Sequence, residues 1–265
     1  MDADNKNIKD PSYDELRIQN SALRAQLEQA LPNRQYIWML FVETSRRLQI
    51  SSASIKAAVS SLLNYDLFWD PANQHEFLET IDTSVDKVSR LVVLLALAFR
   101  AEAGSLEIKR EPQSLQEILA VVQANATTKN PKLKLRLSLP KEGKPVLVDY
   151  EYLTIALEYL FELLAAGQKA EKIQIRAVEN PNDWFLDIDG LDEADLDLIH
   201  NMHYCKTDQH ALSRYSVVPE MILGLHVACE IFHLHEIELE RAKVSQGEPI
   251  LRLVIPAFIT NPMES

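Results

Sequence analysis

The spacing of hydrophobic residues predicts a largely helical first third of the chain. From Tyr13 to Ala30, core-type positions recur at alternating intervals of three and four residues, with the polar Asn20 at one of them. This spacing is typical of a short coiled-coil seam, in which an asparagine can fix the register of a parallel dimer. A single amphipathic helix that packs on its own chain gives the same pattern, so both alternatives stay open. Pro32 is expected to end or kink this helix.

Two longer helices are predicted next. Residues 35–67 contain no glycine or proline, and Asp70 followed by Pro71 is suited to start a second helix. We expect that helix to run to about Ala103 and to stop at Gly104. Its apolar residues cover a face that is too broad for one facing helix, and two copies of the hairpin in a four-helix bundle would bury it. These residues are Phe77, Ile81, Val85, Val88, Leu91, Val92 and Leu95.

After Gly104 the pattern changes to short strands and helices, which predicts an α/β sandwich with helices on one face of a mixed sheet. Leu106 and Ile108 suggest a first strand, and Ser114 with Glu117 forms a capping box that opens a helix. Apolar and polar residues alternate over 133–139, as in a strand with one solvent-exposed face. The other expected elements are helices at 115–128, 150–166, 192–202 and 219–234, strands at 172–178, 183–189, 236–241 and 249–256, and an irregular segment at 204–217.

Length, composition and charge narrow the possible functions. A chain of 265 residues suits two modules plus an extension, and its 47% hydrophobic and 25% charged residues are ordinary for a globular protein. The net charge of −12 disfavours binding to nucleic acid. No apolar run approaches the roughly 20 residues that span a bilayer, and the N-terminus lacks the apolar core of a signal peptide. We therefore expect no membrane anchor and no export. Only two cysteines are present, which suits a reducing compartment, so we expect a cytoplasmic protein.

Several motifs occur in an order that points to one protein family. Phe41 and the run Ser45-Arg46-Arg47-Leu48 lie in the first long helix, Asp189-Gly190 ends a strand, and Gly224 opens a helix that ends in Leu234-His235. Over most of residues 36–257, this order resembles the core of a two-component histidine kinase. The resemblance implies an α+β fold, in which an N-terminal helical hairpin forms a dimeric four-helix bundle and precedes an α/β sandwich of the histidine-kinase ATPase type (Bergerat-like). It divides the chain into a tail with a short coiled coil (1–35), a dimerisation hairpin (36–104), an ATPase-like sandwich (105–258) and a second tail (259–265).

The residue that such kinases phosphorylate is missing from the matching helix. By resemblance, Arg46 stands at the position of the phosphoaccepting histidine, and Arg47 stands at the position of the neighbouring acid. A guanidinium stays protonated and cannot attack the γ-phosphate as a neutral imidazole can. His75 near the start of the second helix is a poor substitute for a phosphoacceptor in the middle of a helix. We therefore expect no catalytic residue in this chain.

The positions that the resemblance assigns to nucleotide binding are altered too. Tyr159 and Leu163 replace two asparagines, and leucine cannot supply the oxygen ligand that Mg²⁺ requires. Asp189 and Gly190 match the strand end that contacts adenine, but only Gly224 remains of the later glycine cluster. No glycine occurs between Gly190 and Gly224, although a nucleotide lid commonly uses glycine for its close approach to phosphate. Nucleotide binding is expected to be lost, and no cofactor is expected.

Two groups of residues were considered as metal sites. Glu158 and Glu162, next to the altered asparagine positions, could rebuild one, but solvated acids on an exposed helical face are the favoured interpretation. The histidines include metal-ligand spacings, yet paired CxxC motifs are absent, so incidental placement is favoured over zinc. No metal site is expected. The residues considered for zinc are His200, His203, Cys205, His233 and His235.

The leading hypothesis is a catalytically inactive, histidine-kinase-like scaffold or regulator in a bacterial two-component pathway. It would form a homodimer through the hairpin and the coiled coil, and its partner would be a response-regulator receiver domain or an active kinase. The alternative is an enzyme, either a divergent ATP-dependent histidine kinase or a phosphotransfer protein. The small residues of the first helix could instead pack within the bundle. By resemblance, the candidate partner-binding residues are Arg46, Arg47, Gln49, Ala53, Ser54 and Ala57.

Overall fold

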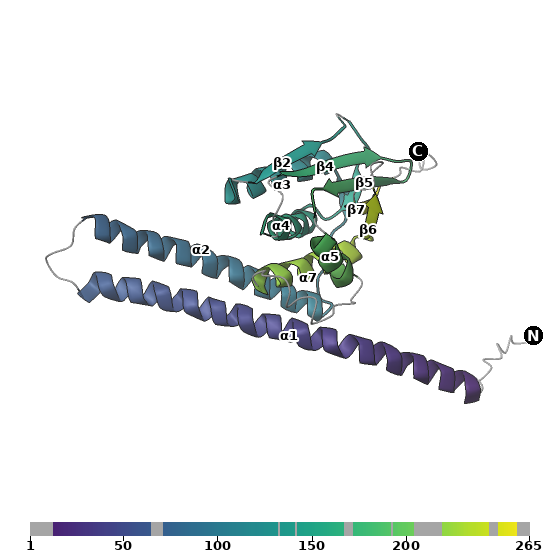
Figure 1. Cartoon of the computed structure of the whole chain (residues 1–265), viewed down its shortest axis with the longest axis horizontal. Helices are drawn as coiled ribbons and strands as arrows, with labels where there is room; N and C mark the ends of the chain where they lie inside the picture. Colours follow the sequence, from purple (N-terminus) through teal and green to yellow (C-terminus); the bar gives the residue numbers. More distant parts are fainter. Residues whose placement is uncertain are drawn as a thin grey trace, which may run out of the picture.

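The computed structural model describes residues 13–64, 71–131, 133–140, 142–166, 172–191, 193–203, 219–243 and 249–258. It consists of a long helical hairpin and an α/β domain that packs on the hairpin away from its turn (Figure 1). Side chains before Gln35 lie outside the described part, so the coiled-coil seam stays a prediction. No helix in the described ranges combines the length and apolar character that crossing a bilayer requires.

The hairpin consists of α1 (Tyr13–Asn64) and α2 (Pro71–Glu102). Of the end or kink predicted at Pro32, the end does not occur, because α1 continues through this residue. A proline removes one backbone hydrogen bond and disturbs one turn, and the bonds on either side keep this long helix continuous. From Ile37 onward, α1 buries side chains at the alternating three- and four-residue spacing of packed helices. These positions are Ile37, Phe41, Thr44, Ser51 and Ala58, with Leu48 half-buried.

Glycine ends α2 as the sequence predicts. Gly104 has φ +60°, and the N–H of Ser105 donates to the carbonyl of Arg100 at 2.9 Å. The strand expected at Leu106 and Ile108 is wrong, because this segment pairs with no other strand, although Leu106 is buried. A small antiparallel pair follows, and neither of its strands is predicted by the sequence pattern. Its strands are β1 (Glu111–Gln113) and β3 (Val146–Val148).

The main sheet has five strands in the order β2-β4-β5-β7-β6. β2 runs parallel to β4, and every other neighbouring pair is antiparallel. This is the mixed sheet that the pattern predicts. β6 begins two residues later than expected, after Glu236 turns the chain with φ +58°. The strands are β2 (Lys134–Ser138), β4 (Lys172–Glu179), β5 (Asp183–Asp189), β6 (Glu238–Lys243) and β7 (Pro249–Pro256).

Helices cover one face of this sheet and join it to the hairpin. Ser114 caps α3, because its hydroxyl accepts from the N–H of Glu117 at 3.3 Å. α7 lies between the sheet layer and the hairpin and contacts α1, α2 and α4 (Figure 1). Side chains of the hairpin and of the α/β domain therefore form one continuous hydrophobic core. The helices are α3 (Leu115–Lys129), α4 (Tyr150–Ala166), α5 (Glu193–His203) and α7 (Pro219–Leu234).

Candidate functional site

Arg46 lies on the exposed side of α1. Its Nε and a terminal nitrogen donate to the two carboxylate oxygens of Glu43, at 2.9 and 2.6 Å. The hydrogen bond and charge of Glu43 raise the pKa of Arg46, and the same hydrogen bond lowers the pKa of Glu43. The position thus carries a permanent cation in a local ion pair and has no nucleophilic nitrogen.

Arg47 points in a different direction from its neighbour. Its guanidinium lies 3.1 Å from a carboxylate oxygen of Glu220, at the start of α7, and both side chains are largely buried. A second carboxylate, on Glu43, lies 3.7 Å away. The residue that replaces the acid of the resembling motif therefore ties the hairpin to the α/β domain. Sequence reasoning could not find this pair, because Arg47 and Glu220 are far apart in the chain.

Leu163 and Tyr159 both belong to packed parts of α4. Leu163 is only 1% exposed and belongs to the hydrophobic core. Tyr159 lies against α7 at Gly224, where a Cβ would come within 2.9 Å of ring atom Cδ1 and 3.1 Å of Cγ. Burial, followed by the charges of Glu162 and Glu158, raises the pKa of Tyr159 far above its usual range. Neither position carries an amide oxygen, and the tyrosine ring fills the space beside Gly224.

Asp189 and Gly190 end β5, as expected. The N–H of Gly190 donates to the Oδ1 of Asp189 at 2.6 Å, and Gly190 has φ +94°. The Asp189 carboxylate therefore accepts a hydrogen bond within its own turn. Asp189 does not line the cavity to which Tyr159 contributes.

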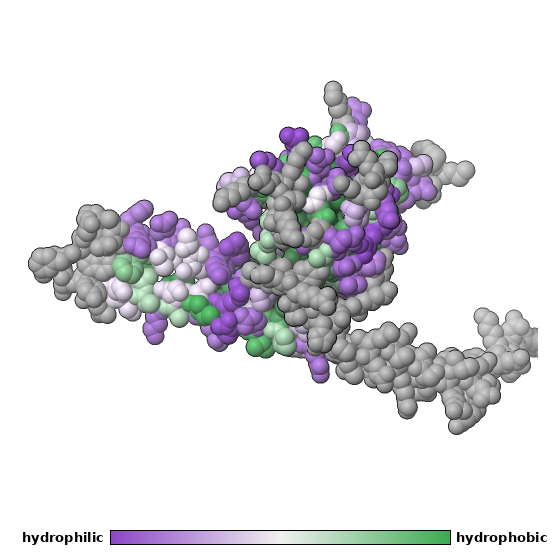
Figure 2. Space-filling view, viewed as in Figure 1, coloured by the Kyte–Doolittle hydropathy of each residue, from purple (hydrophilic) through white to green (hydrophobic). Residues whose placement is uncertain are grey.

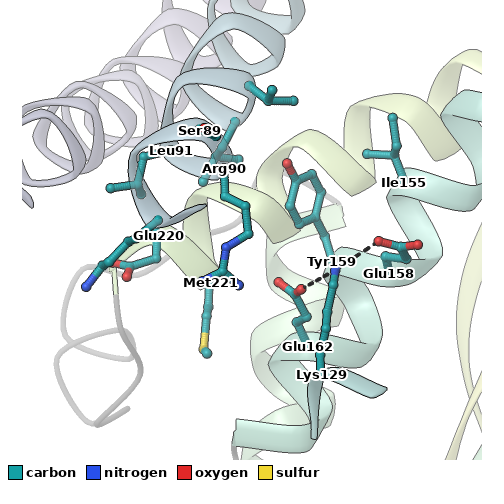
Figure 3. A pocket seen from close by; sticks show the side chains of 13 residues that line it. Ser89, Arg90, Leu91, Lys129, Ile155, Glu158, Tyr159, Glu162, Glu220 and Met221 are labelled. Atoms are coloured by element: carbon teal, nitrogen blue, oxygen red, sulfur yellow. Dashed lines mark hydrogen bonds and ion pairs between the residues drawn. The ribbon is translucent and has the colours of Figure 1, made fainter. Parts of the chain in front are cut away.

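That cavity, of about 550 Å³, lies between α2 on one side and α3, α4 and the start of α7 on the other (Figure 3). Lys129 donates to Glu158 at 3.0 Å and to Glu162 at 2.8 Å. Burial lowers the pKa of Lys129, but the hydrogen bonds and charges of the two glutamates outweigh it and raise the pKa overall. Asn125 also donates to Glu158, at 2.6 Å. The interpretation of Glu158 and Glu162 as solvated acids is wrong, because a lysine from the facing helix binds both.

The histidines serve the packing of the α/β domain. The rings of His203 and His233 lie 4.3 Å apart, and burial, followed by the charges of His233 and His200, lowers the pKa of His203 to about 4. The Nε2 of His235 accepts from the N–H of Asp149 at 2.9 Å, while its Nδ1 lies 2.7 Å from the carbonyl of Ile231. Cys205 falls outside the described residues. Within the described ranges, no three His, Cys, Asp or Glu side chains gather as metal ligands.

The candidate partner-binding residues divide into two sets. Arg46, Gln49, Ala53 and Ala57 recur at intervals of three and four residues and are exposed, so they form one stripe on α1. We call these four residues the Arg46 stripe. Arg47 is held by Glu220, and the hydroxyl of Ser54 donates to the carbonyl of Ile50 at 3.1 Å.

A second exposed stripe is apolar. On α2, four large apolar residues recur every seven residues, and on α1 two exposed apolar pairs that are three heptads apart flank the buried seam. The apolar residues of the two helices meet where the ring centroids of Trp38 and Phe99 lie 6.3 Å apart. The Phe99 ring stacks on that of Phe41, with the centroids 4.2 Å apart. Green hydrophobic residues are visible along the hairpin in Figure 2. We call this set the apolar stripe: Trp38, Val42, Val59, Leu63, Leu78, Val85, Val92 and Phe99.

Comparison with known proteins gives the fold. No protein-family profile and no curated protein matches the chain. Among solved structures, the Acinetobacter baumannii histidine kinase AdeS is similar with a TM-score of 0.52 and 17% identity, over 79% of this chain and 96% of that one. This chain has the fold of a histidine-kinase core. The two long helices and the mixed-sheet domain thus confirm the predicted architecture of an individual chain.

Two further histidine-kinase structures match at lower similarity. The ATP binding domain of PrrB from Mycobacterium tuberculosis has a TM-score of 0.41 and 19% identity, over 57% of this chain and 99% of that one. A histidine kinase from Burkholderia phymatum has a TM-score of 0.38 and 16% identity, over 81% and 97% of the two chains. At these identities the likeness concerns fold, and function depends on the residues described above.

Proposed function

We propose that this chain is a histidine-kinase-like signalling protein that does not transfer phosphate and acts as a dimeric scaffold or regulator in a bacterial two-component pathway. The packing of Tyr159 on Gly224 carries the proposal, because a side chain fills the space beside the glycine that, by resemblance, remains from the later glycine cluster. Arg46 and the buried Leu163 support it, since they supply neither a nucleophile nor a metal ligand.

The proposed dimer is a homodimer that forms through the apolar stripe. Isolated apolar side chains are common on protein surfaces, but a series that follows the heptad spacing along α2, beside two apolar pairs in one heptad phase on α1, marks a helix-packing face. A second hairpin presents the same stripe, so two copies would bury both in a four-helix bundle. The paired series on α1 and α2 favours a second copy over a single added helix.

The Arg46 stripe is the proposed surface for a partner protein. Its four residues are exposed. Gln49 shares the heptad position of Val42 and Leu63, whereas Arg46, Ala53 and Ala57 lie to one side of the apolar stripe, so a dimer would leave these three at its edge. A receiver domain of a response regulator is the partner that the resemblance favours. An active kinase that pairs through the apolar stripe is the alternative partner, and the protein would then work as a heterodimer in the cytoplasm.

The deciding experiment combines light scattering with calorimetric titration of Mg-ATP. We expect a folded dimer that releases no binding heat and incorporates no phosphate from labelled ATP. The Val92→Glu variant should be monomeric, because it places a charge in the apolar stripe. The matched control Val121→Glu alters an exposed valine on α3 and should remain dimeric. Micromolar binding of Mg-ATP, or labelling of the protein, would contradict the proposal and favour a divergent kinase.

A further inference from the structure

The cavity between the hairpin and the α/β domain has walls from both parts of the molecule. α2 contributes one wall, and α3, α4 and the start of α7 contribute the others (Figure 3). Its volume of about 550 Å³ lies within the range of small-molecule sites, roughly 300–1,000 Å³. A second hollow of about 260 Å³ shares Arg90, Lys129, Glu162 and Met221 with it. Arg90 therefore stands where the two hollows adjoin.

The charges around the cavity are not all neutralised within the protein. Lys129 is paired with Glu158 and Glu162, and Glu220 is paired with Arg47. Arg90 lies in the described part of the chain without a hydrogen bond or ion pair to another described residue. Figure 3 shows its side chain extending from α2 toward α4 and α7. A guanidinium in this position presents several donors that match a carboxylate.

Apart from the charged side chains, which include Lys87, and from Ser89, the lining is apolar and aromatic. The Tyr159 ring stands across the cavity from Arg90, and burial keeps its hydroxyl protonated. Around them lie aliphatic and thioether side chains that would bury a ring or a branched chain. The cavity thus combines two cations, Arg90 and Lys87, that form no ion pair with another described residue, with a largely hydrophobic interior. The apolar lining residues are Leu91, Val93, Leu94, Ile155 and Met221.

We propose that this cavity binds a small amphipathic monoanion, an aromatic or branched aliphatic carboxylate. The carboxylate would pair with Arg90 at the rim, and the apolar body would lie against Tyr159, Ile155 and Met221. A nucleoside triphosphate does not fit this pattern, because Glu158, Glu162 and Glu220 place three carboxylates in the lining. A monoanion would pair with the guanidinium of Arg90, with the ammonium group of Lys87 in the same lining.

Such a ligand would act as an effector of the arrangement of the two parts. A molecule that contacts α2 and α4 at once stabilises the packing of the hairpin on the α/β domain that forms the cavity. The size of this effect is set by how much more tightly the molecule binds this packing than any other. The site shares no residue with the apolar stripe or the Arg46 stripe. Ligand binding at this site can therefore be tested separately from dimer formation and partner binding. If naphthoate does not bind, the proposal that the protein is a dimeric scaffold is unaffected.

The test is calorimetric titration of the full chain with 2-naphthoate, with the uncharged 2-naphthamide as the matched ligand. We expect one naphthoate per chain, and about tenfold weaker binding of the amide because the charge-assisted hydrogen bond is lost. Arg90→Gln should weaken naphthoate binding about tenfold and leave the amide unchanged. Arg100→Gln, on the same helix but outside the lining, is the matched control.

A second variant tests the cavity without removing the charge. Ser89 lines the cavity and is exposed, so Ser89→Trp should fold and should block both naphthoate and naphthamide. The proposal is overturned if the folded protein binds no naphthoate, or if Arg100→Gln weakens binding as much as Arg90→Gln. It is also overturned if Ser89→Trp binds normally, or if Mg-ATP competes with naphthoate for the site.

Discussion

The ring of Tyr159 lies directly against Gly224, where α4 crosses α7. A Cβ at residue 224 would sit 2.9 Å from Cδ1 and 3.1 Å from Cγ of that ring, which is too close for unstrained packing. These are atoms near the base of the side chain, so they cannot move away without a shift of α4. Gly224, which by resemblance remains from the later glycine cluster of a nucleotide site, therefore serves helix packing in this protein.

Gly224→Ala should destabilise the fold by about 1–3 kcal/mol, because the added methyl group overpacks the contact with Tyr159. In an unobstructed helix interior, the same change would stabilise by up to about 1 kcal/mol, since glycine is a poor helix former. Chemical denaturation gives the free energy of unfolding for both proteins. The change should reverse sign in the Tyr159→Ala background, where the obstruction is gone. An unchanged cost in that background would show that Tyr159 is not the obstacle.

Lys129→Met should destabilise the fold by about 1 kcal/mol, a value kept small because the pair is partly solvated. The variant retains most of the side-chain volume but leaves Glu158 and Glu162, four residues apart on α4, as neighbouring like charges. Denaturation at low and high salt provides the measurement, and the loss should shrink as salt screens the repulsion. The matched control is Lys129→Met in a Glu158→Gln/Glu162→Gln background, where the cost should largely disappear.

The stability of the α/β domain should fall as the solution is acidified from pH 6.5 toward pH 4. The pKa of His203 is lowered from 6.5 to about 4, so in this window the unfolded chain binds a proton that the folded chain does not. The free energy of unfolding should therefore decrease, by about 2 kcal/mol at pH 5 from this group. The pKa of His235 is also lowered, chiefly by burial, and acts in the same direction.

Denaturation midpoints measured between pH 7 and pH 4 test this dependence. His203→Phe removes the titrating group and should make the pH profile shallower, whatever it costs at pH 7. His75 is exposed on α2, and His75→Asn should leave the slope unchanged. An equally steep profile for His203→Phe would assign the dependence to other groups.

The pair of Arg47 and Glu220 should hold α7 against the hairpin. Arg47→Glu would place three carboxylates together, with Glu43 and Glu220, and should speed amide hydrogen exchange at the start of α7. The double variant Arg47→Glu/Glu220→Arg should restore part of the protection, with a coupling energy of about 1 kcal/mol. Arg46→Glu alters the exposed neighbour and should leave exchange in α7 unaffected.

The helices and most strands could be predicted because their signals are local. Hydrophobic periodicity, the Gly104 stop and the Ser114 cap are each readable within a few residues, and the structure has the helices and strands that they indicate, within a few residues at the ends. The missed β3 is only three residues long, and a strand so short carries little periodicity. The strand predicted at Leu106 does not form. A buried apolar residue in an irregular segment gives the same sequence signal as a residue in a strand, which explains this error.

By resemblance, the order and spacing of motifs assign Arg46, Tyr159 and Leu163 to altered positions, which stays a prediction, and chemistry limits what arginine or leucine can do. What those residues contact was not available. Lys129 binds acids some thirty residues away, and Arg47 binds Glu220 from another part of the fold. Such contacts depend on how complete helices pack, and packing sums many weak interactions between segments that no local pattern relates. The residue types at given positions therefore determine which chemistry those side chains can perform. Only the three-dimensional packing creates the cavity around Arg90 and the ion pair of Arg47 and Glu220 between the hairpin and the α/β domain.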